Sequence, residues 1–225
     1  IQADFSYLKD LNSPEANSFA GFLQTEIIPK TIRVLESILR VRRLEHFILN
    51  SANCSKYLKI PEHLLNTPIQ SDLLIIVSFD TTGKYKKNKV EASAVHCYQD
   101  QLTKRSIVGK ITFREDLNPQ SKVDIDYIVW LSLHEISHVL LFNKSLYRHF
   151  IDESFNLLGI NNVLIQTANK KGQKIYNVAT KRVLQKAIKH FKCPGLQGVP
   201  LEYNTNGLSA ITGHWSRRAM NTDYM

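Results

Sequence analysis

The order of hydrophobic patterns along this chain predicts an α/β (α+β) fold, a twisted sheet backed by two long helices with a cleft along one sheet edge. A long helical pattern comes early in the chain, and several runs typical of strands follow it. A second helical pattern, almost entirely apolar, comes after the strands, and a mostly helical and irregular part ends the chain. With 225 residues, 43% of them hydrophobic, the chain is long enough for one large domain or two lobes.

The first long helix is predicted between Phe22 and Val41, where apolar residues recur on one face. Pro29 is expected in the first turn of this helix, because the N–H that proline lacks has no partner there. The preceding residues 1–21 are mixed and polar, and Ser13-Pro14-Glu15 within them is a typical helix start.

Four segments that follow have the composition of strands. The clearest is Asp72–Phe79, whose continuous β-branched and aliphatic run suits a strand covered on both faces. Val90–Cys97 and Ser106–Phe113 alternate well enough for two more, and Arg42–Leu49 also reads as a strand. Residues 50–71 are expected to form a loop.

The second long helix contains the residues most indicative of function. The run Val123–Leu133 lacks Gly and Pro and is apolar almost all round, so we expect this helix to be buried in a core. It leads into the motif H-E-x-x-H, formed by His134, Glu135 and His138. Histidines at i and i+4 lie on one helix face and can bind one zinc ion, while the glutamate can move a proton to and from a water molecule. Bonding of both histidines to backbone carbonyls is the alternative.

After Phe142 the pattern is weaker. Helical fragments are predicted over Tyr147–Leu158, a hairpin around Lys171-Gly172, and an amphipathic helix over Val178–Phe191. We divide the chain into residues 1–143, which contain the H-E-x-x-H helix, and residues 144–225, expected to supply a further ligand to the same catalytic unit.

The formal net charge of +9 raises the possibility of nucleic-acid binding. The basic residues are scattered, with no long stripe of interleaved aromatics, so we expect no nucleic-acid partner. A basic nucleic-acid-binding domain with an accidental H-E-x-x-H remains the alternative, for which salt-dependent DNA retention without zinc would be evidence. No apolar run is long enough to span a bilayer, and no signal peptide is visible.

A catalytic zinc needs a third protein ligand, and two common arrangements fail here. A glutamate on the next helix would require a G/N-E-x-x-x-D pattern, and Asp152-Glu153 lacks the flanking residues. In compact metzincins a histidine lies six residues after the second ligand, a position that Lys144 occupies here.

A longer pattern resembles the leishmanolysin family of metzincins, which brings the third histidine from far downstream. His214 stands in Gly213-His214-Trp215, is followed by Arg217-Arg218, and precedes Met225 by 225 − 214 = 11 residues, the family's distance to the methionine of the Met-turn. The upstream features that also match are Cys54, Pro61, His63, Asp72–Val77 and Cys97. The resemblance covers roughly residues 25–225.

The resemblance implies a metzincin-type fold and a zinc-dependent endopeptidase that acts on proteins or peptides. His134, His138 and His214 would hold one Zn²⁺ per chain, with Glu135 as general base and then acid and Met225 in the Met-turn. The strand Ser106–Phe113 would pair with an extended substrate.

The resemblance also implies a secreted or cell-surface protein, with any membrane association through segments outside this chain, which we expect to be a piece of a longer protein. In that compartment Cys54 and Cys97 are predicted to form a disulfide, and Cys193 to remain without a partner in this piece.

One departure from the family pattern lies directly after the motif. Leu141 replaces the glycine that ends the family's helix, so we expect a slightly longer helix, a buried Leu141 and a left-handed conformation at Asn143. This departure is the basis for a second alternative, a catalytically weak adhesion or binding module with the same fold.

Overall fold

The structure is a computed structural model that describes residues 1–9, 11, 13–51, 53–55, 58–168, 172, 174–202 and 213–216. It divides into two compact units. The first comprises Ile1–Asp100 and Ser106–Leu140, and the second comprises Gln101–Arg105 and Leu141–Met225.

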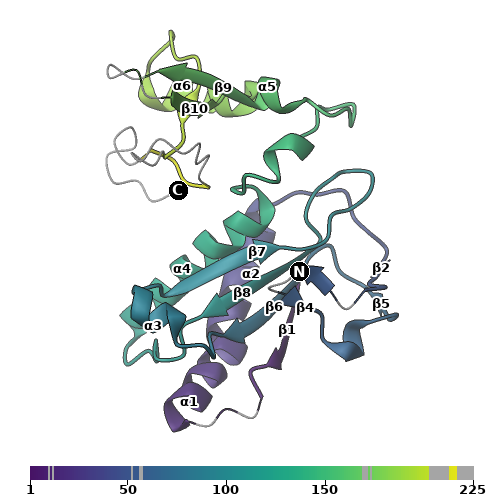
Figure 1. Cartoon of the computed structure of the whole chain (residues 1–225), viewed down its shortest axis with the longest axis vertical. Helices are drawn as coiled ribbons and strands as arrows, with labels where there is room; N and C mark the ends of the chain where they lie inside the picture. Colours follow the sequence, from purple (N-terminus) through teal and green to yellow (C-terminus); the bar gives the residue numbers. More distant parts are fainter. Residues whose placement is uncertain are drawn as a thin grey trace. The chain divides into compact units, whose positions relative to one another are not determined.

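The first unit contains a four-stranded mixed sheet in the order β1-β6-β8-β7 (Figure 1). Its strands are β1 (Gln2–Tyr7), β6 (Leu74–Phe79), β7 (Ala92–His96) and β8 (Val108–Phe113). β6 runs parallel to both β1 and β8, and β7 is antiparallel to β8. The expected strands β6, β7 and β8 are confirmed, whereas β1 was not predicted.

The sheet order corrects the expectation for substrate pairing. The predicted strand Ser106–Phe113 contains β8, which is hydrogen-bonded to β6 on one side and to β7 on the other. Both of its backbone edges are therefore used within the sheet. β7 is the edge strand on this side of the sheet, so no other strand of the described sheet pairs with its outer edge.

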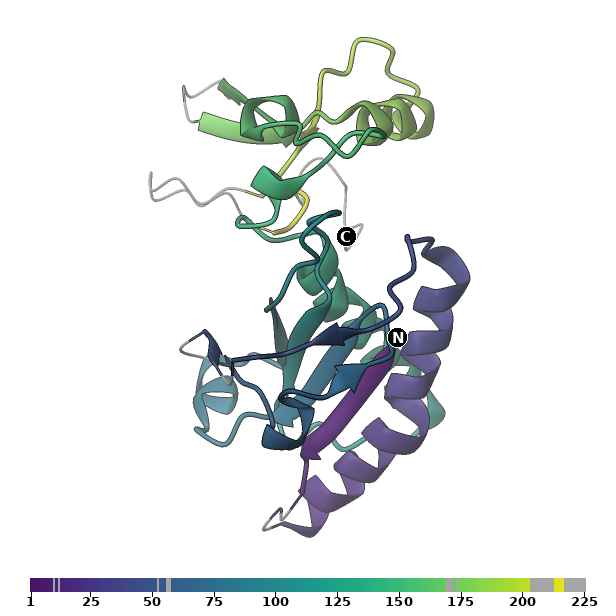
Figure 2. The same cartoon turned by 90° about the vertical axis from the view of Figure 1, so that its right-hand side faces the viewer.

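One face of this sheet is covered by helices. A continuous helical run comprises α1 (Pro14–Phe22), a π-helical turn (Leu23–Ile27) and α2 (Ile28–Ile38), and Figure 2 shows it as a long helix beside β1. The Ser13 side chain caps its start by accepting a hydrogen bond from the Ala16 N–H. Pro29 lies in the first turn of α2, as predicted, but the π turn makes that turn continuous with the helix before it.

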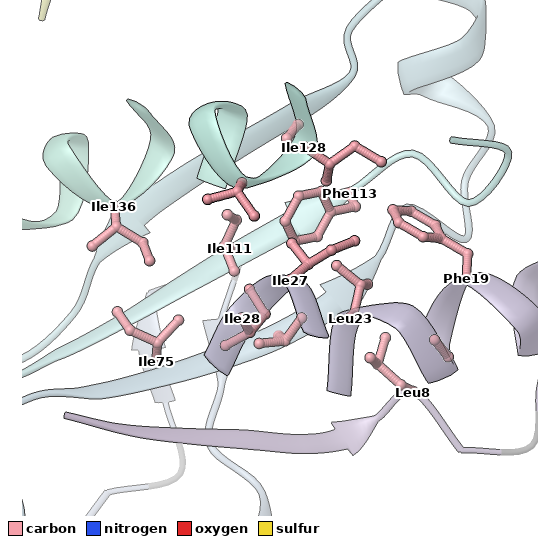
Figure 3. Close-up of a cluster of buried hydrophobic side chains, with 14 of the residues drawn as sticks. Leu8, Phe19, Leu23, Ile27, Ile28, Ile75, Ile111, Phe113, Ile128 and Ile136 are labelled. Atoms are coloured by element: carbon pink, nitrogen blue, oxygen red, sulfur yellow. The ribbon is translucent and has the colours of Figure 1, made fainter. Parts of the chain in front are cut away.

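The second helix on this face is α4 (Lys122–Leu140). Figure 3 shows Phe19 and Ile27 of the first helical run and Ile128 of α4 gathered around Phe113 of the sheet, while Ile136 lies further along α4 in the same cluster. The prediction that α4 is buried in a core is confirmed for one side of the helix and wrong for the other, where Val123, Tyr127 and Trp130 are exposed. Those three side chains lie at helical spacing on the side of α4 away from the core.

The other face of the sheet is covered by the segment between α2 and β6. Its short elements are β2 (Phe47–Ile48), β3 (Asn53–Ser55), β4 (Leu58–Lys59), a 3-10 turn (Glu62–Leu64) and β5 (Pro68–Ile69). Leu49, Ile60 and Leu64 pack there against Leu74 and Ile76 of β6. With cover on both faces, all six residues of β6 are buried, as its sequence predicted.

Two predictions for this covering segment needed correction. The strand expected over Arg42–Leu49 is reduced to β2, and the loop expected over residues 50–71 contains three short strands and a 3-10 turn. Pairings as short as β2 with β5 are set by the packing around them rather than by local sequence. The disulfide between Cys54 and Cys97, which joins this segment to the residue after β7, is confirmed.

The second unit contains a three-stranded antiparallel sheet in the order β11-β10-β9. β9 (Leu164–Ala168) and β10 (Lys174–Val178) form the predicted hairpin, and α6 (Lys181–Phe191) confirms the predicted amphipathic helix. The remaining elements of the described residues are α3 (Lys84–Asn88) in the first unit and a 3-10 turn (Tyr147–His149), α5 (Ile160–Val163) and β11 (Val199–Pro200) in the second. Among the described residues, no helix combines the length and apolar character needed to cross a bilayer.

Of the helical fragments predicted over Tyr147–Leu158, only the 3-10 turn Tyr147–His149 is present. The Asp152 side chain accepts hydrogen bonds from the backbone N–H groups of Ser154 and Asn156, which a helix would direct to carbonyl groups instead. Phe155 has a φ of 64°, which no α-helix allows. The aspartate thus stabilises a tight loop in place of a helix.

Candidate metal centre

The helix α4 brings His134 and His138 together on one face. Their ring centroids are 5.0 Å apart and their planes are nearly perpendicular at 86°. Both side chains are only partly buried, because they lie on the side of α4 away from the core residues Ile128 and Ile136. Two imidazoles on successive turns, with access to solvent, can offer their nitrogens to one metal ion.

Unlike the side chains of His134 and His138, the side chain of Glu135 is buried. It is only 7% exposed, and its Oε1 atom lies 4.0 Å from Nε2 of His134. Burial raises the pKa of the Glu135 carboxyl to about 7, although a backbone hydrogen bond from Ala94 of β7 acts in the opposite direction. The carboxyl group of Glu135, which lies beside the imidazole of His134, therefore has a pKa suited to proton transfer near neutral pH.

Gly109, a glycine in β8, allows α4 to pack close to the sheet. A Cβ atom built on Gly109 of β8 would be 2.3 Å from Cγ1 of Val139, the residue directly after His138. The role of Gly109 was not predicted from the sequence, although an isolated glycine inside a strand pattern often marks a close approach between elements. Gly109 thus sets the distance between the sheet and the helix turn that holds His138.

The end of α4 differs from the expectation in three ways. The helix ends at Leu140 and so does not extend beyond Leu141, whose side chain is exposed at 48% rather than buried. Asn143 is not among the residues with positive φ. Its side-chain oxygen instead accepts hydrogen bonds from the backbone N–H and the hydroxyl of Ser145, which turns the chain without a left-handed residue.

His214 lies in the second unit, on a segment held by backbone hydrogen bonds. The N–H of Glu202 donates to the carbonyl of His214 at 2.8 Å, and the N–H of Ser216 donates to the carbonyl of Pro200 at 2.8 Å. The ring nitrogen Nδ1 of His214 is 3.7 Å from a carboxylate oxygen of Glu202. A carboxylate beside one ring nitrogen favours the orientation that leaves the other nitrogen for a metal.

Trp215 anchors the same segment. Its ring centroid is 5.1 Å from that of Phe142, and it packs against the buried cluster of the second unit, which includes Leu201. Phe142 follows the end of α4 by two residues, so the segment containing His214 is packed onto the chain just after that helix. Met225, assigned to the Met-turn, lies outside the described residues.

The donor groups suit zinc better than a harder cation. Zinc takes imidazole nitrogens readily, whereas calcium and magnesium prefer oxygen ligands. His134 and His138 supply nitrogens, and the buried Glu135 beside them is positioned for a proton rather than for a role in a carboxylate cage.

Comparison of the sequence with known proteins identifies the family of this chain. The sequence model of the leishmanolysin peptidases matches residues 20–225, which is most of the chain. The chain belongs to the leishmanolysin family. That family consists of zinc-dependent metallopeptidases, and the mixed sheet with its helices agrees with the leishmanolysin-type fold.

Individual relatives agree with this placement. A ciliated left-right organizer metallopeptidase of Xenopus laevis is 30% identical over 152 residues, 66% of this chain and 20% of the relative. Its counterpart in Mus musculus is 28% identical over 73% of this chain and 25% of the relative. A leishmanolysin-like peptidase of Drosophila melanogaster is 24% identical over 69% of this chain and 27% of the relative. The chain thus spans about a quarter of the length of these curated relatives.

Proposed function

We propose that this chain forms the zinc centre of a metalloendopeptidase, with His134, His138 and His214 as the three protein ligands and Glu135 as the proton carrier. Each histidine offers one ring nitrogen. His214 is included because its spacing to Met225 matches the family pattern, and because Trp215 packs onto Phe142 just beyond α4.

The observation that carries this proposal is the position of Glu135. Glu135 is a buried carboxyl group next to His134, with its pKa raised to about 7, on a helix whose core face is otherwise mostly apolar. When bound, zinc would supply a Lewis acid that polarises a peptide carbonyl and makes a water molecule more acidic. Glu135 would take the proton from that water and deliver it to the amine that leaves.

The substrate would lie along the outer edge of β7 rather than along β8. An extended peptide can add to an exposed strand through backbone hydrogen bonds. Glu135 is hydrogen-bonded to the backbone of Ala94, at the middle of β7, so a peptide paired with this strand would pass beside the proton carrier.

We infer a location outside the cytosol, at the cell surface or in the extracellular medium. The support is the disulfide between Cys54 and Cys97, since such bonds are rare in proteins kept in a reducing compartment.

The proposal is tested by measuring metal content and peptide cleavage on the same samples. Purified protein should contain one zinc ion per chain. Glu135→Gln should retain that zinc and lose about 10²–10⁴-fold in cleavage rate, because it removes the proton carrier and no ligand. The control is Glu115→Gln, at an exposed glutamate after β8, which should retain both properties. Full activity in Glu135→Gln would refute the assigned mechanism.

A further inference from the structure

The second unit contains a groove that the proposed peptidase site does not use. It has a volume of about 790 Å³ and lies along α6. Its apolar lining consists of Val183, Ala187 and Phe191 from α6, together with Val199 of β11 and Trp215. The helix is amphipathic, yet Ala187 is its only buried residue, and Phe191 is 39% exposed. A substantial part of the apolar face of α6 is therefore open to a ligand.

The same groove has a basic wall. Arg182, Lys186, Lys189 and His190 also line it, and all four side chains are exposed. The first three lie one helical turn apart, and residues 181–192 contain no acidic residue. Arg182 is paired with Glu153 at the surface, while neither Lys186 nor Lys189 has an ion pair within the described part of the chain.

We propose that this groove docks an acidic peptide segment with large apolar side chains, a function beyond that of the zinc centre. Apolar side chains of the peptide would cover Val183, Ala187 and Phe191, and its carboxylates would face Lys186 and Lys189. Burial of apolar surface supplies affinity in such a groove, and complementary charge supplies specificity.

The shape and the charge pattern together favour a peptide over other anions. A polyanion such as nucleic acid would satisfy the lysines but leave the apolar hollow exposed. A bilayer would meet the exposed side of α6, whereas the apolar lining of the groove extends beyond α6 to Val199 and Trp215. A fatty acid carries a single charge, whereas the groove offers cations on successive turns of α6.

Trp215 provides a local reporter, because the chain has two tryptophans and Trp130 is in the other unit. The experiment uses the Trp130→Phe, Glu135→Gln protein, so that Trp215 is the only tryptophan and no peptide is cleaved, with zinc held constant. The probe is a short synthetic peptide with glutamate and leucine on opposite faces of a helix. Its titration should change Trp215 emission in a saturable way, and affinity should fall as salt is raised.

Variants of the groove determine whether the binding is specific. Lys186→Glu with Lys189→Glu should weaken binding by about tenfold or more, because two attractions become repulsions. Phe191→Ser should also weaken it by removing apolar contact. The matched control, Lys84→Glu with Lys87→Glu on α3, makes the same charge change in the other unit and should leave affinity unchanged.

Three results would overturn the proposal. They are the absence of a saturable change, equal binding of a peptide with glutamine in place of glutamate, and unchanged affinity in both groove variants. A response of Trp215 to phosphatidylglycerol vesicles but not to the peptide would identify α6 as a membrane-binding helix instead. Since binding is read in a protein without Glu135, its failure leaves the proposed peptidase function untouched.

Discussion

His214 is the residue on which the completeness of the metal centre depends. We expect His214→Ala to lower zinc affinity by more than about a hundredfold, because removing a ligand should exceed the 10–100-fold effect of losing a supporting group. The protein should still fold, since the segment is held by backbone hydrogen bonds and by Trp215. Competition with a chelator measures the affinity, and His46→Ala, at an exposed histidine, is the control. Equal zinc affinity in both variants would mean that another group is the third ligand.

Leu141 is the second residue with a clear expectation. Its side chain is exposed and the helix already ends at Leu140, so Leu141→Gly should change the free energy of unfolding by less than about 1 kcal/mol. Peptide cleavage should also be unchanged, since the turn depends on Asn143 and Ser145. Denaturant titration and rate measurements check this. A more active variant would show that leucine impairs the site.

For individual residues, the sequence predicted the site best where the chemistry depends on residues that are close together in the chain. His134 and His138 lie on successive turns of one helix, with Glu135 directly after the first, so their arrangement follows once the helix forms. The surroundings of Glu135 could not be predicted in this way. They depend on contact with β7, which lies about forty residues earlier in the chain.

At the scale of elements, the contact between β8 and α4 is the one most sensitive to substitution. Gly109→Ala would place a methyl group within 2.3 Å of Val139, so the helix or the strand must shift. We expect a loss of about 1–3 kcal/mol in unfolding free energy, the usual range for overpacked cores. Zinc affinity should fall as well, because Val139 adjoins His138.

Gly21→Ala is the matched control for that substitution. A Cβ at Gly21, within α1, meets no atom within 4 Å, so alanine should stabilise the helix by about 0.5–1 kcal/mol. Urea unfolding of both variants gives the comparison. If both substitutions changed stability in the same direction and by the same amount, packing at Gly109 would not be the cause.

Helices and strands were predicted correctly where their own residues are enough to indicate the type of element. β6 is apolar throughout, and α4 combines apolar periodicity with an absence of glycine and proline. β1 was overlooked because its six residues include Gln2, Asp4 and Ser6, and it is a strand only through its pairing with β6. The exposed face of α4 at Trp130, 70% exposed, was predicted to be buried because composition alone does not show which neighbours a helix has.

For the whole molecule, the disulfide is a covalent constraint that substitution can remove. It closes a loop of 43 residues between Cys54 and Cys97. Replacing both cysteines by serine should lower the free energy of unfolding by roughly 3–4 kcal/mol on the chain-entropy account. Cys193→Ser, at the free and exposed cysteine, should have no such effect. Thermal unfolding with and without reductant measures both, and equal loss in the two variants would contradict the assignment.

The parallel pairing of β1 with β6 has a consequence for how the chain reaches its native state. Gln2 is opposite Leu74, so the first strand has no partner until 74 − 2 = 72 further residues have been made. Contacts between such distant positions slow folding, because the loop between them must close before any pairing is gained. During synthesis, the emerging Gln2–Tyr7 segment and later the unpaired side of Leu74–Phe79 would be open to association with other chains. Demand for chaperone assistance should therefore rise when Gln2–Tyr7 emerges and fall once Leu74–Phe79 has left the ribosome.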